Sequence, residues 1–357
     1  MSAALLHPLA TALPAVVDEP CDYAPLPPGD RLLGTGEPGF QDRPIPVQER
    51  TRRFQVLAPA PLTLVGFRAF LTAGGRFLTD ESLDPSWNRD RYAARFAGGA
   101  SPENLRADFH AQGVAVTLPA DEVTVEEPVS ALCAAEPVNY GSWLFRILPK
   151  LASLPDDGRA LLVYAQEPWQ REMLAFFAPG RRVVPHDPRR AHRLRDAQVA
   201  TARNAGAYFD ERTKAFYGTA VERVPGRSSL RRVYLSRRGQ RIRPILNEDV
   251  VEEVLAAEGF AIVRPEAMPI EDRIRVIRDA EVIACPGGSG LFNLVFARSA
   301  RLVVDVEPAR TWLYAHNNVM KSLGLPHAIL FGEQPGGEGV HAPWTVPIDR
   351  LRRAVRL

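Results

Sequence analysis

The sequence lacks the features that mark disulfide-rich, membrane-spanning and nucleic-acid-binding proteins. Only three cysteines occur in 357 residues, Cys21, Cys133 and Cys285, and their spacing fits neither a disulfide framework nor a metal motif. No run of about 18 apolar residues is present, so we expect no membrane-spanning helix. The formal net charge is only +2, which gives no reason to expect a nucleic-acid partner. These absences favour a cytoplasmic protein.

The composition is that of a globular protein long enough for two domains. Hydrophobic residues make up 46% of the chain and charged residues 24%. Proline and glycine concentrate in residues 1–50, which predicts an irregular N-terminal arm. We expect an N-terminal domain over 51–220, a C-terminal domain over 221–345, and a C-terminal helix over 346–357 that can pack back on the first domain.

The C-terminal half alternates short apolar runs with segments of helical periodicity. The runs predicted as strands are 233–235, 260–263, 282–284 and 302–304. The helices predicted between and after them cover 247–257, a segment starting at Pro269, a short segment from about Leu291, and 311–323. Repeated β-α units predict an α/β fold with a parallel, Rossmann-like sheet, because parallel strands need helical crossovers.

A glycine-rich turn follows the third of these strands. Its sequence is Cys-Pro-Gly-Gly-Ser-Gly-Leu over residues 285–291. Glycines let backbone N–H groups approach an anion closely, and a helix N-terminus adds a favourable dipole. The alternative is a tight strand-to-helix turn in which the glycines serve packing alone.

An arginine-rich loop, Ser236–Arg243, follows the first of these strands. If both strands belong to one sheet, the loop and the glycine turn can face the same crevice at its carboxyl edge. Arginine suits phosphate because its planar fork donates paired hydrogen bonds. The alternative is a solvated loop in an arginine-rich protein.

Several blocks in consistent order carry a resemblance to a known family. The blocks are Asn139–Leu144 with Leu148–Leu151, Val233–Arg237, Arg243 with Asn247 and Glu248, and Pro286–Asn293. Over about 135–330 the chain resembles glycosyltransferase family 61, of the bacterial capsular and extracellular polysaccharide type. The family's corresponding blocks read roughly N-Y-x-H-W-L, Y-I-S-R and P-H-G-A-G-L-x-N.

The resemblance implies a GT-B fold, in which two Rossmann-like domains face a cleft, and a nucleotide-sugar donor. It also implies inverting transfer of a sugar to a glycan or lipid-linked acceptor, with the N-terminal domain on the acceptor side. Arg237 and Arg243 would hold the diphosphate, and Asp305 would reach the ribose or the sugar. Asn247 is either a donor-site residue or a helix cap. The implied donor-binding residues are Arg237, Arg243, Asn247, Gly287, Gly288, Ser289, Gly290, Leu291, Asn293 and Asp305.

Three positions depart from the family pattern. Ser142 and Gly287 stand where the family has histidines, and Arg146 stands where an acidic residue is usual. The general base, which must reach the acceptor hydroxyl, is therefore unassigned. Candidates in the N-terminal domain are Asp108, His110, Glu136 and Glu167.

The triplet Asp305-Val306-Glu307 is similar to the Asp-x-Asp metal motif of the other large glycosyltransferase fold. It lies late in the chain, and in a GT-B enzyme arginines and a helix N-terminus neutralise the leaving diphosphate. We therefore expect no metal, and no cofactor besides the nucleotide-sugar substrate.

Two other functions remain open at this stage, a catalytically silent nucleotide-binding paralogue and transfer of a non-sugar group. The arginine-rich stretch 181–195 can meet an anionic acceptor or a lipid-phosphate surface, or it can be a solvated linker. A cytoplasmic location is expected, with peripheral association with the inner membrane as a further option.

Overall fold

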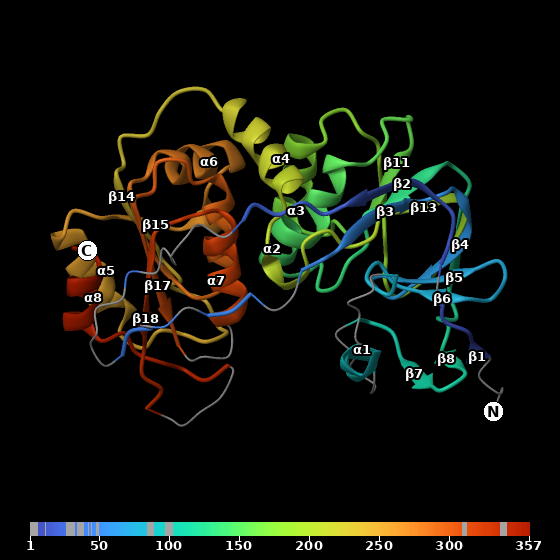
Figure 1. Cartoon of the computed structure of the whole chain (residues 1–357), viewed down its shortest axis with the longest axis horizontal. Helices are drawn as coiled ribbons and strands as arrows, with labels where there is room; N and C mark the ends of the chain where they lie inside the picture. Colours follow the sequence, from blue (N-terminus) through green and yellow to red (C-terminus); the bar gives the residue numbers. More distant parts are fainter. Residues whose placement is uncertain are drawn as a thin grey trace. The chain divides into compact units, whose positions relative to one another are not determined.

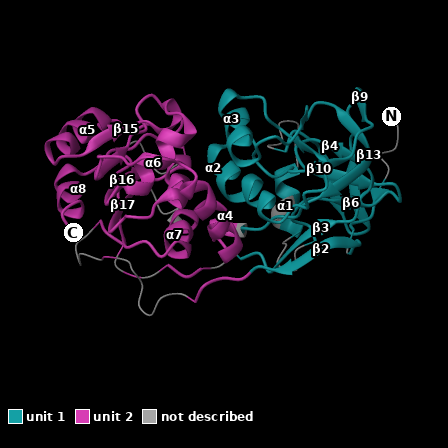
Figure 2. Cartoon of the chain, turned by 90° about the horizontal axis from the view of Figure 1, so that it is seen from above, with its two compact units in different colours: residues 1–21, 50–205 teal, residues 22–49, 206–357 magenta. Residues whose placement is uncertain are grey.

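A computed structural model of the chain describes residues 6–10, 12–25, 33, 39–41, 43, 45–47, 50–83, 89–96, 103–308, 313–335 and 341–357. These residues form two compact units (Figure 1, Figure 2). Unit 1 comprises residues 1–21 and 50–205, and unit 2 comprises residues 22–49 and 206–357. The chain passes from one unit to the other after residues 21, 49 and 205, and the last of these passages lies in the short 3-10 turn Ala205–Ala207, before the domain boundary predicted at residue 220.

Unit 1 is built on a mixed eight-stranded sheet with the order β12-β11-β10-β13-β4-β5-β6 and with β9 also paired to β13. The strands β12, β11, β10 and β13 are parallel, whereas β4, β5 and β6 form antiparallel hairpins. Gly75, at φ 70°, turns the chain between β5 and β6. The strand bounds are β4 (Ala60–Val65), β5 (Ala69–Thr72), β6 (Phe77–Leu78), β9 (Glu122–Val125), β10 (Val129–Ala131), β11 (Ala160–Val163), β12 (Val183–Pro185) and β13 (Ala191–Val199).

Smaller elements complete unit 1. A three-stranded sheet has the order β1-β8-β7, and β2 pairs antiparallel with β3. The apolar segment from Trp143 forms a π-helix followed by a 3-10 helix, and most of its apolar side chains are buried. The bounds are β1 (Leu6–His7), β2 (Ala15–Pro20), β3 (Arg53–Leu57), α1 (Arg89–Phe96), β7 (Ala107–His110), β8 (Gly113–Val116), α2 (Tyr140–Ser142), η1 (Trp143–Ile147), η2 (Leu148–Ala152) and α3 (Pro168–Phe177).

Unit 2 contains an all-parallel five-stranded sheet with the order β15-β14-β16-β17-β18. The α/β alternation predicted for this half of the chain is thereby confirmed. Its strands consist almost wholly of buried apolar residues, as expected for a parallel sheet covered on both faces. The bounds are β14 (Arg232–Leu235), β15 (Ala261–Val263), β16 (Val282–Pro286), β17 (Leu302–Glu307) and β18 (His327–Phe331).

Helices cover both faces of this sheet (Figure 1). On one face, Val251 and Leu255 of α5 and Leu351 of α8 share a core with Val304 and Val306 of β17. On the other face lie α6, α7 and the 3-10 helix η5. The helix bounds are α4 (Glu211–Glu222), α5 (Glu248–Ala257), η4 (Pro265–Ala267), α6 (Ile270–Asp279), η5 (Ser289–Phe296), α7 (Leu313–Ser322) and α8 (Ile348–Ala354). Residues 311 and 312, at the predicted start of the helix that became α7, lie outside the described residues.

Both ends of the chain form ordered elements. The C-terminal helix α8 packs within unit 2, against α5 and β18. Residues 15–20 of the predicted irregular arm form strand β2 in unit 1. Phe40 forms a β-bridge with Leu330, so this part of the arm supplies hydrogen bonds to the edge strand β18.

The arginine-rich stretch 181–195 is structured as well. It contains β12 and most of β13, and is not a solvated linker. Several of its exposed arginines are paired with carboxylates, for example Arg193 with Glu122 at 2.6 Å and Arg182 with Glu127 at 2.6 Å. Within the described ranges, none of the helices has both the length and the apolar character that a membrane crossing requires.

Candidate functional site

The strand order of unit 2 creates a switch point between β14 and β16. The chain runs from β14 to β15 on one side of β14, whereas β16 lies on its other side. In open parallel sheets, ligands bind in the crevice beyond the carboxyl ends of the strands at such a point. Arg237 follows β14 there, and Gly287 and Gly288 follow β16. The sheet thus places the arginine loop and the glycine turn at the same edge.

The side chains of the two candidate arginines approach the glycine turn directly. A Cβ atom on Gly288 would overlap the guanidinium of Arg237 and would lie 3.4 Å from Nη2 of Arg243. Gly288 has φ 153°, a conformation that side-chain-bearing residues rarely adopt. The Nη1 group of Arg237 also donates to the Gly287 carbonyl at 3.5 Å. The structure therefore brings Arg237, Arg243 and the glycine turn into one cluster.

Both arginines are substantially buried. Burial lowers the pKa of Arg237, and burial together with the neighbouring Arg237 lowers the pKa of Arg243. Within the described part of the chain Arg237 forms no ion pair, and its Nη2 group donates to the Ile242 carbonyl at 2.8 Å. By contrast, Arg238 is half exposed and paired with Glu252 at 3.1 Å. Two positive charges held in a partly dry setting favour an anionic ligand.

The backbone at Arg243 is held in an unusual conformation. Its φ is 54°, a value that is rare for residues other than glycine. The indole N–H of Trp344 donates to the Arg243 carbonyl at 3.1 Å, and Trp344 is fully buried. A strained residue that its surroundings fix in place is common at ligand sites.

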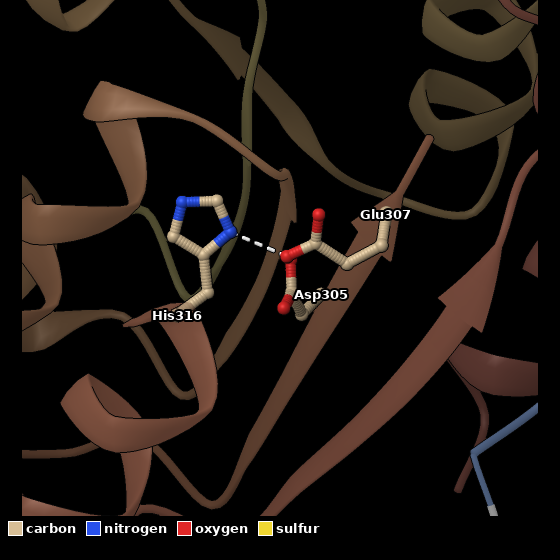
Figure 3. Close-up of side chains that lie close together, drawn as sticks. All are labelled: Asp305, Glu307 and His316. Carbon is tan, nitrogen blue, oxygen red and sulfur yellow. Dashed lines mark hydrogen bonds and ion pairs between the residues drawn. The ribbon is translucent and has the colours of Figure 1, made fainter. Parts of the chain in front are cut away.

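Behind the glycine turn lies a buried group of three titratable side chains, Asp305, Glu307 and His316 (Figure 3). Asp305 and Glu307 are alternate residues of β17, so their side chains lie on the same face of the sheet. His316 comes from α7, and its Nδ1 atom is hydrogen-bonded to the Glu307 carboxylate. A Cβ atom on Gly287 would overlap that carboxylate.

Burial dominates the ionisation of this group. It raises the pKa of Asp305 well above its usual range, and the adjacent Glu307 carboxylate acts in the same direction. Burial raises the pKa of Glu307 to about 7, against the opposing effects of the adjacent Asp305 side chain, Arg243 and Arg237. It lowers the pKa of His316 to about 4. Of the two carboxylates, that of Glu307 lies against the turn, at Gly287.

Comparison with known families gives a match over the middle of the chain. Residues 140–304 match the family described as Glycosyltransferase 61, a segment that ends on β17 and includes both the arginine loop and the glycine turn. This matched segment, a little under half of the chain, is similar to glycosyltransferase family 61. No curated protein matches the chain significantly.

Three of the remaining donor-site candidates, Asn247, Asn293 and Leu291, make hydrogen bonds to the backbone of unit 2. Asn247 precedes α5, but its side chain does not cap the helix; its amide donates to the Val346 carbonyl and accepts from the Val346 N–H, both at 2.9 Å. Asn293 is buried and donates to the Gly290 carbonyl at 2.8 Å. Leu291 is fully buried, and the Leu291 N–H donates to the Gly288 carbonyl at 3.1 Å. Ser289 opens η5.

The four base candidates lie in unit 1 in three separate places. Asp108 and His110 are both in β7, where Asp108 pairs with Arg106. Glu167 caps α3 in a capping box with Gln170. The structure does not gather these side chains into one cluster.

The fourth candidate, Glu136, lies beside the family's altered positions. Arg146 donates to Glu136 at 3.0 Å and to the Ser142 hydroxyl at 3.2 Å, and Arg95 donates to Glu136 at 2.9 Å. Burial raises the pKa of Glu136, but these two arginines outweigh it and the pKa is lowered. Ser142 and Arg146, two of the residues that depart from the family pattern, are thus in direct contact.

Proposed function

We propose that this protein transfers a sugar from a nucleoside-diphosphate donor to a hydroxyl group of a glycan or glycoconjugate. The match of residues 140–304 to glycosyltransferase family 61 supports the transferase class. The observation that carries the donor assignment is the convergence of Arg237, Arg243 and the glycine turn at the β14–β16 switch point.

The diphosphate of the donor accounts for each part of this cluster. The guanidinium groups supply two positive charges and paired hydrogen-bond donors. The glycines remove the side chains that would hold a phosphate away from the backbone, and the first N–H groups of η5 face the end of the turn. These same groups stabilise the negative charge that develops on the leaving diphosphate. On this proposal no metal ion has to bridge the diphosphate to the protein.

The proposal extends to the whole chain as a GT-B enzyme, with unit 2 as the donor domain and unit 1 as the acceptor domain. Inversion at the sugar carbon would require a base from unit 1, which stays unassigned. A cytoplasmic polysaccharide or a lipid-linked precursor is the acceptor class that the family resemblance favours.

The test is a panel of nucleotide-sugars and free nucleoside diphosphates, titrated into the purified protein by calorimetry, followed by assays of donor hydrolysis and transfer. We expect at least one nucleoside diphosphate to bind, with no gain in affinity on addition of millimolar Mg²⁺. Binding without hydrolysis or transfer to any acceptor would favour a silent nucleotide-binding paralogue. Failure of every nucleotide to bind would reject the donor site.

A further inference from the structure

A set of ligand atoms suited to a metal ion lies behind the glycine turn. Asp305, Glu307 and His316 each contribute one such atom, and these atoms all lie within 4.8 Å of one another (Figure 3). The exposed fractions of the three residues are 0%, 0% and 4%. We propose that these three residues bind one divalent first-row metal ion of the Mn²⁺ or Zn²⁺ type.

The fold fixes the relative positions of the three ligands. Strand β17 is paired on both sides, with Asp305 opposite Cys285 of β16 and opposite Ile329 of β18. Its two carboxylates therefore extend from a rigid backbone with the alternation of a β-strand. His316 approaches from α7 and already contacts Glu307. A site built on a strand and a helix holds its ligands more exactly than one built on loops.

Asp305 provides the second, independent observation. Within the described part of the chain, neither oxygen of its carboxylate has a hydrogen-bond donor, although the side chain is fully buried. An ionised carboxylate without a donor in the interior is costly, so it must either take a proton or meet a cation. The second oxygen of Glu307, Oε2, also lacks a hydrogen-bond partner. A metal ion bound by the three side chains would satisfy these atoms together.

The donor set indicates which metals would bind. Carboxylate oxygens suit Mg²⁺, Ca²⁺ and Mn²⁺, whereas imidazole nitrogen suits first-row transition metals and Zn²⁺. Two carboxylates with one imidazole therefore favour Mn²⁺ or Zn²⁺ over Mg²⁺ or Ca²⁺. The contact between Nδ1 of His316 and Glu307 would give way to metal ligation by both groups.

This ion differs from a metal that arrives with the donor. Its ligands are all buried, so the protein holds it without help from a phosphate. It would also preserve the charge of the donor site: two ionised carboxylates beside Arg237 and Arg243 would cancel the two positive charges, whereas a divalent ion cancels the carboxylates instead. Metal binding itself does not depend on the proposed function.

The test uses the full-length protein with no nucleotide present. After removal of metals with a chelator and removal of the chelator, calorimetric titration with MnCl₂ or ZnCl₂ should show one bound ion per chain. D305N and H316Q should each weaken binding by at least about tenfold. The control is H341A, which removes an exposed histidine of the same unit and should bind the ion like the wild type.

Two results would overturn the proposal. One is the absence of binding by the wild-type protein, which would mean that Asp305 and Glu307 share a proton instead. The other is unchanged binding in D305N and H316Q. If those variants do not fold, X-ray absorption at the zinc edge of the wild-type protein decides the question: one imidazole among oxygen ligands is expected, and sulfur or several imidazoles would contradict it. Because no nucleotide is present in these measurements, their outcome is separate from the test of the proposed donor site.

Discussion

The guanidinium group of Arg237 occupies the space that a β-carbon of residue 288 would need. Gly288 is thus more than a turn residue, since its missing side chain gives the arginine its place beside the turn. The pair joins the end of β14 to the end of β16, strands that are neighbours in the sheet but separated by β15 in sequence. The contact therefore depends on the strand order of unit 2.

Gly288→Ala should weaken nucleoside-diphosphate binding by about tenfold or more, equivalent to ~1.4 kcal/mol. The methyl group would displace the Arg237 guanidinium, and alanine would be strained at φ 153°. Calorimetric titration measures the loss, with circular dichroism as the check on folding. Gly218→Ala, in α4, is the matched control because its nearest neighbour, Nη2 of Arg298, would lie at 3.9 Å. Equal affinity in a folded Gly288→Ala protein would show that the turn is structural only.

Arg243→Ala should weaken the same binding by ~1.5–3 kcal/mol, the range for a charge-assisted hydrogen bond to a buried charged group. Arg238→Ala should have little effect, since Arg238 is half exposed and already paired with Glu252. The two variants remove the same charge from the same loop, so their difference separates a specific contact from diffuse attraction. Similar losses of affinity in both would contradict the assignment of Arg243.

The local features of unit 2 could be predicted from the sequence, but its long-range contacts could not. Apolar runs separated by helical periodicity identify the strands, and the carboxyl ends of parallel strands share one edge. That is why the loop at Arg237 and the turn at Gly288 could be expected near each other. The order that makes β14 and β16 neighbours is set by packing over the whole sheet, which no local pattern records.

The acidic residue at the turn illustrates the same limit. The sequence drew attention to Asp305, whereas Glu307 contacts Gly287. Their alternate positions indicate that both side chains lie on one face of the sheet. Which of the two lies against the glycine turn depends on the register between β17 and β16, which the local sequence does not give. The contribution of His316 has no local signal, because α7 brings it to the site through tertiary packing. In unit 1, likewise, the antiparallel pairing of β4, β5 and β6 depends on contacts that no local pattern of residues records.

Asn247→Ala should lower the stability of unit 2 by about 1–3 kcal/mol, the cost of leaving buried hydrogen-bonding groups without partners. The Asn247 amide makes two hydrogen bonds to the backbone of Val346, which lies just before α8. We expect a lower thermal midpoint, with nucleotide affinity close to that of the wild type once the protein is folded. Loss of affinity with an unchanged midpoint would instead support Asn247 as a donor ligand.

His186 should make the stability of unit 1 sensitive to mild acid. The His186 side chain is fully buried beside His192, with the two ring centroids 5.1 Å apart. Burial is the main cause, and electrostatic repulsion from His192 the second, that lowers the pKa of His186 to about 3. In the unfolded chain the pKa of His186 is near 6.5, so at a pH between about 3 and 6.5 the unfolded state binds a proton that the folded state does not bind. The stabilising effect is complete above pH 6.5 and is lost as the pH falls toward 3, by roughly 1.4 kcal/mol for each pH unit.

The measurement is denaturant unfolding of the wild type and His186→Leu at pH 7, 6 and 5. The free energy of unfolding should fall with pH more steeply in the wild type than in His186→Leu, since leucine binds no proton. The difference between the two proteins removes the effect of carboxylates, which titrate in both. His110→Ala serves as control, because His110 is exposed on β7 and its removal should leave the slope unchanged. Parallel pH profiles for the wild type and His186→Leu would mean that His186 accepts its proton in the folded state.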